Sequence, residues 1–271
     1  MIDHLSSSQI NLYLQCALKY KYAYIDRLPK PFRPSALVFG GALHSALAWL
    51  HQERMKGNGV STDRLFRIFE ADWYSQTVDT DIRYKDGEEE MKLVVMGKEM
   101  LGLYFRQPAG KIKGAEVPFI VPLANPVTGE DLGVNLEGFF DLVEVGDTIV
   151  EFKTSAQALS PNDIRAQLQL TAYGYAFELL YGRSPRAFKV VNFVKNKKPR
   201  IELLDTSRGK SHYETFLLIA EQVLRGIRSE IFFPRPGFWC KDCEYANICP
   251  IWTADAAPVT AAQKEKAGIA P

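Results

Sequence analysis

The chain has 271 residues, of which 46% are hydrophobic and 24% are charged, and its formal net charge at pH 7 is +1. This length and apolar content allow a large buried core, and we expect one domain over residues 1–250. No apolar run approaches the ~20 residues that a membrane-spanning helix needs, so we expect a soluble, cytoplasmic protein without a membrane partner. The near-neutral charge excludes a global attraction to nucleic acid, and a phosphate-binding surface would have to arise from local clusters of Lys and Arg.

The first part of the chain is predicted to be helical. The serines at 6–8 are N-cap candidates for a helix that carries Cys16 near its middle or end. After a proline-rich stretch, helix formers with apolar residues at helical spacing predict a second helix from Gly40 to about Glu53, with His44 on it. Apolar residues further on indicate two more helices, which we interpret as a helical insertion at about residues 52–108.

The second part of the chain favours strands. Runs of β-favouring residues predict three consecutive strands, over 116–123, 134–145 and 148–153. Ser160-Pro161-Asn162-Asp163 resembles a capping box and predicts a helix from Ser160 to about Leu180. A hairpin over 188–194 and 200–204 and an amphipathic helix over 211–229 follow. This order predicts an α/β fold with a central mixed sheet flanked by helices, and the non-periodic tail 251–271 is expected to be disordered.

The cysteines are the first sharp chemical feature. Cys240, Cys243 and Cys249 crowd the segment 238–250, whereas Cys16 stands alone near the other end. A reducing cytoplasm disfavours disulfides. A Cys-x-x-Cys pair with a further nearby Cys suits metal–thiolate ligation, and the remote cysteine would complete a set of four that closes the chain on itself. An iron–sulfur cluster and a zinc ion both remain open.

Asp141, Glu151 and Lys153 form the second feature. Glu151 and Lys153 are two apart on a predicted strand, so both side chains leave the same face. A carboxylate and an ammonium on a concave face suit a Mg²⁺ ion and a lysine that stabilises or helps to generate the attacking hydroxide. For Asp141 to share this face, we expect a register that pairs it with Lys153 and pairs Val143 with Glu151, through a loop that has three residues or contains a bulge. The alternative is the polar face of a solvated antiparallel sheet.

Residues 19–24, with the sequence Lys-Tyr-Lys-Tyr-Ala-Tyr, form an aromatic and basic stretch. Its tyrosines could stack on bases while its lysines neutralise phosphates. Alternatively, the tyrosines belong to the core and the lysine stems extend along it to solvent. The sequence does not decide between these two interpretations.

Taken together, these motifs resemble those of the RecB-like branch of the PD-(D/E)XK nuclease superfamily. The resemblance extends to the iron–sulfur members found in AddB and in CRISPR-associated RecB-like exonucleases. It covers about residues 5–250 and depends on five motifs in the same order, namely Gly40-x-x-x-His44, Gly138-x-x-Asp141, Glu151-x-Lys153, Gln169-x-x-x-Tyr173 and the set Cys16, Cys240, Cys243 and Cys249. One departure is Ala17, where many relatives have a proline, and it leaves the Cys16 thiol intact.

The resemblance implies a restriction-endonuclease-like core and a role for each motif. A Mg²⁺ or Mn²⁺ ion would be bound by His44, Asp141 and Glu151, with the backbone carbonyl of Phe152 as a further ligand. Lys153 would be the catalytic lysine, Gln169 and Tyr173 would orient the substrate or that lysine, and Glu116 resembles a less regular acidic position. The four cysteines would bind a 4Fe–4S cluster, with zinc as the rival occupant.

The implied activity is hydrolysis of DNA phosphodiesters by a metal-activated water. We expect an exonuclease acting on single-stranded or end-containing DNA, in DNA repair or in phage or CRISPR DNA processing. Its partners would be DNA and a helicase, recombination or CRISPR-adaptation protein. A hypothesis of another class is a catalytically silent nucleic-acid-binding or adaptor module, and the intact Asp141, Glu151 and Lys153 argue against it.

Overall fold

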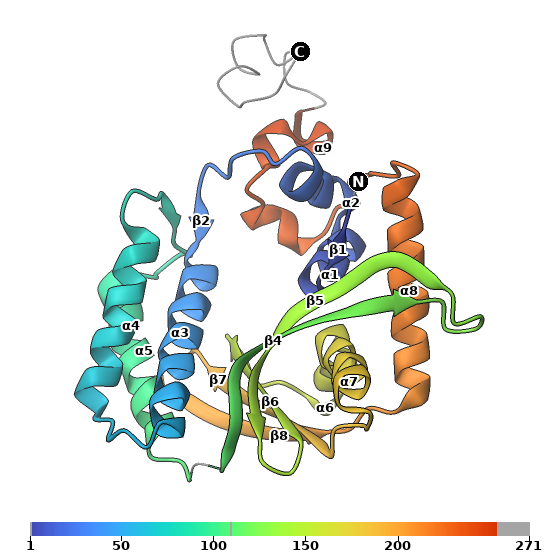
Figure 1. Cartoon of the computed structure of the whole chain (residues 1–271). Helices are drawn as coiled ribbons and strands as arrows, with labels where there is room; N and C mark the ends of the chain where they lie inside the picture. The colour runs from blue at the N-terminus through green and yellow to red at the C-terminus, as the bar shows by residue number, and fades with distance from the viewer. Residues whose placement is uncertain (1, 109, 254–271) are drawn as a thin grey trace.

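The computed structural model describes residues 2–108 and 110–253. Its centre is a mixed six-stranded sheet made of β1 (His4–Leu5), β4 (Ile112–Ala124), β5 (Asp131–Glu144), β6 (Thr148–Ser155), β7 (Ala187–Val194) and β8 (Arg200–Thr206). The strands β4 to β8 follow one another in space, and the short β1 pairs in parallel with β5 (Figure 1). Only β6 and β7 are parallel among the long strands. A separate small sheet joins β2 (Arg33–Pro34) to β3 (Ile82–Arg83). The α/β fold with a mixed central sheet is confirmed.

Helices cover both faces of the sheet. One face carries α3 (Ser35–Met55), α4 (Thr62–Thr77) and α5 (Glu90–Phe105), and the other carries α7 (Leu168–Tyr181) and α8 (Lys210–Arg228). Phe39 of α3 and Phe152 of β6 belong to the first core, while Phe177 of α7 and Phe140 of β5 belong to the second. Both cores exclude water because apolar side chains of helix and strand are buried against each other. None of the helices that the structure describes is long and apolar enough to cross a membrane.

The two ends of the described chain pack against each other. The N-terminal part holds α1 (Ser7–Gln15), α2 (Ala17–Tyr20) and a π-helix (Lys21–Ile25), and the C-terminal part holds two short 3₁₀ helices (Phe238–Asp242 and Ala246–Ile248) and α9 (Pro250–Thr253). Arg235 donates from Nη1 to the Leu14 carbonyl at 2.7 Å, and Tyr245 Oη donates to the Leu28 carbonyl at 3.2 Å. In Figure 1 the blue and red segments accordingly lie together. Of the tail that we expect to be disordered, residues 251–253 belong to α9, and residues 254–271 lie outside the described residues.

The turn between β5 and β6 fixes which residues face each other. Val143 pairs with Ile149 and Glu144 with Thr148, so three residues form the loop. Two of them, Gly146 and Asp147, have φ values of 93° and 63°. The predicted loop length is therefore confirmed, but the predicted pairing of Asp141 with Lys153 is wrong. Extending the observed register by one pair places Asp141 opposite Glu151, and the two carboxylates still share a face because the shift is an even number of residues.

The helix expected from Ser160 to about Leu180 is broken. It consists of α6 (Pro161–Arg165) and α7, and the break lies at residues 166–167. The capping box of Ser160 and Asp163 is present, so the start is confirmed. At the break, the buried guanidinium of Arg208 donates to the Ile164 carbonyl at 2.7 Å and to Thr171 Oγ1 at 3.0 Å. A side chain distant in sequence thus satisfies carbonyls that a continuous helix would have used itself.

Candidate active site

Five elements place the predicted site residues around one end of the sheet. His44 comes from α3, Asp141 from β5, Glu151 and Lys153 from β6, and Gln169 and Tyr173 from α7, while β4 adds Glu116. Gly138 shapes this region, since a Cβ atom there would lie 2.6 Å from the Phe119 ring. That ring is buried and contacts Tyr173, with centroids 5.8 Å apart. Glycine at 138 therefore allows β4 and α7 to pack closely beside Asp141.

Three of these side chains form a compact group of possible metal ligands. Ligand atoms of His44, Glu116 and Asp141 all lie within 4.8 Å of one another. His44 Nδ1 lies 3.6 Å from Asp141 Oδ1. The other Asp141 oxygen accepts a hydrogen bond from the Phe152 backbone N–H at 2.8 Å. The aspartate is thereby held so that Oδ1 faces the group.

Glu116 has an unusual backbone. Its φ of 51° lies in the left-handed region, which costs free energy for a residue with a side chain. Its neighbours Ala115 and Val117 pair with Leu142 and Phe140, so Glu116 lies opposite Asp141. Such strain clusters at functional sites. The sequence resemblance marks Glu116 only as a less regular acidic position, because a left-handed φ gives no signal in the sequence.

The remaining predicted residues form a hydrogen-bonded chain. Glu151 is 1% exposed, and its Oε1 lies 2.6 Å from Lys153 Nζ. Lys153 Nζ also donates to Gln169 Oε1, and Gln169 Nε2 donates to Tyr173 Oη at 2.7 Å. The second Glu151 oxygen, Oε2, is buried and has no hydrogen-bond partner. The lysine is therefore oriented from both sides, and one buried carboxylate oxygen is left to accept a ligand.

The acidic groups raise one another's affinity for protons. Burial, followed by the charge of Asp141, raises the pKa of Glu151 to about 7, although Lys153 acts against this rise. Burial and the Asp141 charge also raise the pKa of Glu116. Burial alone would lower the pKa of His44, but contact with Asp141 raises it overall. These directions indicate an excess of negative charge that a cation would relieve.

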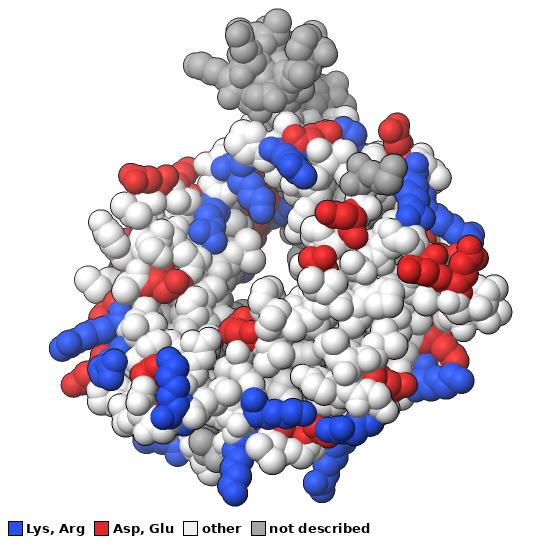
Figure 2. All heavy atoms as spheres, in the orientation of Figure 1, with Lys and Arg blue, Asp and Glu red and all other residues white. Residues whose placement is uncertain are grey.

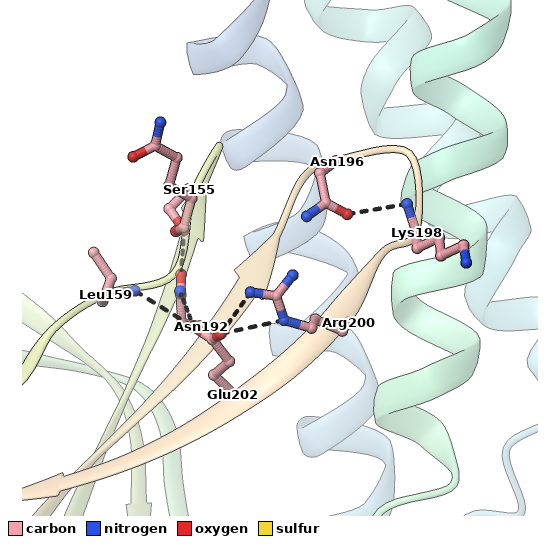
Figure 3. A network of polar contacts seen from close by, with 8 residues as sticks. Ser155, Leu159, Asn192, Asn196, Lys198, Arg200 and Glu202 are labelled. Atoms are coloured by element: carbon pink, nitrogen blue, oxygen red, sulfur yellow. Dashed lines mark hydrogen bonds and ion pairs between the residues drawn. The ribbon is translucent and has the colours of Figure 1, made fainter.

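A polar network fixes the chain that follows Lys153 (Figure 3). The Ser155 hydroxyl donates to Asn192 Oδ1 at 2.9 Å, and Asn192 Nδ2 donates to Glu202 Oε2 at 3.1 Å. Arg200 Nη2 donates to the other Glu202 oxygen at 2.9 Å. Asn192 is fully buried, so its amide has to be paired in this way. The network joins the ends of β6, β7 and β8 behind the site.

Comparison with known proteins identifies the family. Residues 4–250 match the family described as the PD-(D/E)XK nuclease superfamily. The chain belongs to the PD-(D/E)XK nuclease superfamily. None of the curated proteins compared with it matches.

Comparison with solved structures finds a similar fold at low sequence identity. A candidate exonuclease from Eubacterium rectale is 13% identical with a TM-score of 0.59, and the similarity covers 95% of this chain and 90% of that one. The structure of SSO0001 is 14% identical and the similarity covers 92% of this chain and 86% of that one, but its TM-score of 0.46 is too low to support an argument. At such identities the first likeness supports the fold alone.

The residues present fit the divalent metal ion that PD-(D/E)XK nucleases use. Carboxylate oxygens and an imidazole nitrogen are suitable donors for Mg²⁺ or Mn²⁺. Glu116 and Asp141 face each other with like charges, and Glu151 Oε2 is a buried acceptor without a partner. Membership of the PD-(D/E)XK superfamily and this donor set together support a metal-dependent nuclease.

The PD-(D/E)XK site opens into a cleft of about 910 Å³. Its walls come mainly from α1, α3 and β5, with Gln169 and Tyr173 of α7 and Glu116 of β4. Figure 2 shows this side of the molecule hollowed, with acidic side chains beside the hollow. Among the described residues that line the cleft there is no Lys or Arg. Phosphates in the cleft would therefore meet hydroxyl and amide groups, such as those of Ser7 and Asn11, rather than basic side chains.

The four cysteines lie in the segments that join the two ends of this PD-(D/E)XK chain. Cys16 is between α1 and α2, and the other three are in or beside the C-terminal 3₁₀ helices. All are half-buried, and no disulfide joins them.

Proposed function

We propose that the chain is a metal-dependent DNA nuclease of the RecB-like branch, acting as an exonuclease on single-stranded or end-containing DNA. One observation carries the proposal: the compact His44, Glu116 and Asp141 group lies in the same site as the Glu151 and Lys153 pair. Membership of the superfamily supports the reaction class. The name of the E. rectale protein agrees with an exonuclease activity.

Each residue has a proposed task in the hydrolysis. His44, Glu116 and Asp141 would bind the divalent ion, with Glu151 and the Phe152 carbonyl as further candidates. When bound, the ion supplies Lewis acidity and lowers the pKa of a nearby water. Lys153 holds a positive charge where negative charge develops on the phosphoryl oxygens, and its contacts with Glu151 and Gln169 keep it in place. Tyr173 acts through Gln169.

A structural 4Fe–4S cluster on the four cysteines is the second part of the proposal. The four cysteines come from the N-terminal and C-terminal segments that pack against each other. The resemblance to RecB-like nucleases with iron–sulfur clusters favours this cluster over a single zinc ion. The cysteines are not joined by disulfides, which suits a reducing cytoplasm. From the RecB-like resemblance we also propose a helicase, recombination or CRISPR-adaptation protein as a partner.

The catalytically silent adaptor remains the alternative of another class. It would need no ordered lysine, whereas Lys153 is held by both Glu151 and Gln169. The adaptor hypothesis therefore gives no role to the contacts that hold Lys153 in place.

The deciding experiment is digestion of end-labelled single- and double-stranded DNA with Mg²⁺ or Mn²⁺. We expect cleavage by the wild type and none by Asp141→Asn or Glu151→Gln. Glu137→Gln is the matched control. Glu137 lines the same cleft and lies on β5, as Asp141 does, but it is not part of the group of His44, Glu116 and Asp141. DNA binding without cleavage by the wild type would favour the adaptor.

A further inference from the structure

A second cavity adjoins the active-site cleft. It has a volume of about 1010 Å³, and both cavities are lined by His4 and Gln9. His4 Nε2 and Gln9 Nε2 are 3.3 Å apart, so this single pair of side chains stands between the two spaces. A ligand that fills the cleft and extends past the pair enters the second cavity.

The aromatic stretch at residues 19–24 supplies one exposed ring to this cavity. Tyr20 is 1% exposed and belongs to the core, whereas Tyr24 is 40% exposed and lines the cavity. Tyr20 supports it from behind, with ring centroids 5.2 Å apart and an interplanar angle of 30°. Tyr24 lies in the π-helix, a rare conformation that is frequent at functional sites.

The other tyrosine and the lysines of this stretch contact other parts of the protein. Tyr22 packs on Tyr245, with centroids 5.5 Å apart. The two lysines are ion-paired, Lys19 with Glu244 at 2.5 Å and Lys21 with Asp26 at 2.5 Å. Within the stretch, Tyr24 is therefore the side chain available for a ligand.

Basic groups also line the second cavity, in contrast to the cleft. Arg27 and Arg228 are exposed there, and Arg228 uses Nη2 for one hydrogen bond to the Leu132 carbonyl. Two acidic residues, Asp3 and Glu230, line it as well, so the cavity would not bind every anion through charge alone. An aromatic face beside guanidinium groups is the combination that binds a base together with its phosphate.

We infer that the second cavity is a subsite for single-stranded DNA that continues out of the active-site cleft. Tyr24 stacks on an unpaired base, and Arg27 and Arg228 bind phosphates of the same strand. The strand is single because a base in a duplex is already stacked and paired and has no free face to offer. This inference rests on the proposed function, because it takes the substrate of the cleft to be DNA.

The test compares Tyr24→Leu with Tyr24→Trp, and uses Tyr74→Leu as the matched control. Tyr74 is 68% exposed but lies on α4, on the opposite side of the sheet from α7 and α8. We expect Tyr24→Leu to bind a fluorescent long oligothymidylate about tenfold more weakly in buffer without divalent metal, while tryptophan restores affinity. Hydrolysis of bis(p-nitrophenyl) phosphate, which is too small to reach the second cavity, should stay unchanged.

A register-specific measurement distinguishes stacking from a general loss of affinity. Oligothymidylates with 2-aminopurine at successive positions should show quenching at one position with the wild type and none there with Tyr24→Leu. Arg27→Gln and Arg228→Gln should each flatten the salt dependence of binding by about one unit of slope. Arg67→Gln, an exposed substitution on α4, should not.

The outcomes separate this inference from the proposed function. Equal affinities of Tyr24→Leu and Tyr74→Leu for the long oligonucleotide would overturn the subsite, even if the wild type cleaves DNA. A wild type that hydrolyses neither DNA nor the small phosphodiester would overturn the nuclease, while the binding data would still decide the subsite.

Discussion

Glu116 of β4 lies directly opposite Asp141 of β5, and both carboxylates belong to one group of ligand atoms within 4.8 Å. Like charges in this relationship destabilise a sheet unless a cation lies between them. We expect Glu116→Gln to raise the stability of the metal-free protein by about 0.5 kcal/mol and to abolish the rise in Tm that Mn²⁺ produces in the wild type. Thermal denaturation with and without Mn²⁺ measures both effects. The same Mn²⁺ response in the variant would remove Glu116 from the metal group.

Lys153→Ala should lose turnover but keep metal binding. Its ammonium contacts Glu151 and Gln169 rather than the group of His44, Glu116 and Asp141. We expect kcat on labelled single-stranded DNA to fall by about two orders of magnitude or more, with Mn²⁺ affinity from calorimetry still measurable. Lys189→Ala, on the neighbouring strand β7, is the control. A normal kcat in Lys153→Ala would exclude the lysine from the mechanism.

His51 should make stability depend on pH. It is 2% exposed, its Nε2 is 2.9 Å from Tyr104 Oη, and burial followed by the charge of Arg54 lowers its pKa from 6.5 to about 4. Between these two values the unfolded chain binds the proton and the folded chain does not, so the contribution of His51 to the free energy of unfolding decreases as pH falls from 6.5 toward 4. The raised pKa of Glu151 contributes with the opposite sign, so the His51 effect is obtained by comparison with a variant.

The size of the His51 effect is about 3 kcal/mol at most, since each pKa unit corresponds to about 1.4 kcal/mol. Urea unfolding at several pH values would measure it. His51→Gln should lose less stability than the wild type as pH falls through this window, and the exposed His212→Gln should follow the wild type. A variant slope equal to the wild-type slope would contradict the assignment.

Arg208 should be a strong determinant of stability. It is buried at the break between α6 and α7 and donates to the Ile164 carbonyl and to Thr171 Oγ1. Arg208→Met removes both hydrogen bonds and leaves the Ile164 carbonyl with the 3.3 Å bond from the Gln167 N–H. We expect a loss of about 3 kcal/mol in the free energy of unfolding, measured by urea denaturation. The exposed Arg67→Met controls for loss of a surface charge. A cost below about 0.5 kcal/mol would mean that water replaces the guanidinium.

Cys16→Ser should give a colourless, less stable protein. Wild type purified without oxygen should be brown and contain iron and sulfide in similar amounts. A cluster between distant parts of the chain restricts the unfolded state most, so any loss of cleavage should follow the loss of the fold. Metal analysis and thermal denaturation provide the measurements. A colourless wild type with stoichiometric zinc and no iron would replace the cluster with zinc.

The sequence predicted much of the fold because its signals are local. The capping box at Ser160 and Asp163 and the strand runs around Asp141 and Glu151 depend on neighbouring residues, and the structure has them where expected. The predicted site residues also converge because their strands are adjacent. Their roles in metal binding and catalysis stay predictions.

The features that the sequence did not reveal depend on distant contacts or backbone conformation. The helix break at 166–167 is stabilised by Arg208, which lies some forty residues further along the chain. The hairpin register depends on the positive φ values of Gly146 and Asp147. An aspartate in the sequence does not by itself predict a positive φ. The left-handed backbone of Glu116 is likewise not predictable from its residue type. Local residue propensities therefore do not predict the helix break, the hairpin register or the Glu116 backbone.

The joined ends also set the order in which the cleft is completed during synthesis. Its α1 wall emerges from the ribosome first, yet Tyr13 of that helix donates to the carbonyl of Ile231 and Leu14 accepts from Arg235. Contacts between such distant residues form late, because the loop between them has to close first. A nascent chain that has already made β4, β5 and β6 therefore holds the acidic residues without the wall that faces them. The cleft should therefore be complete only after residues 231–235 have been synthesised and have left the ribosome.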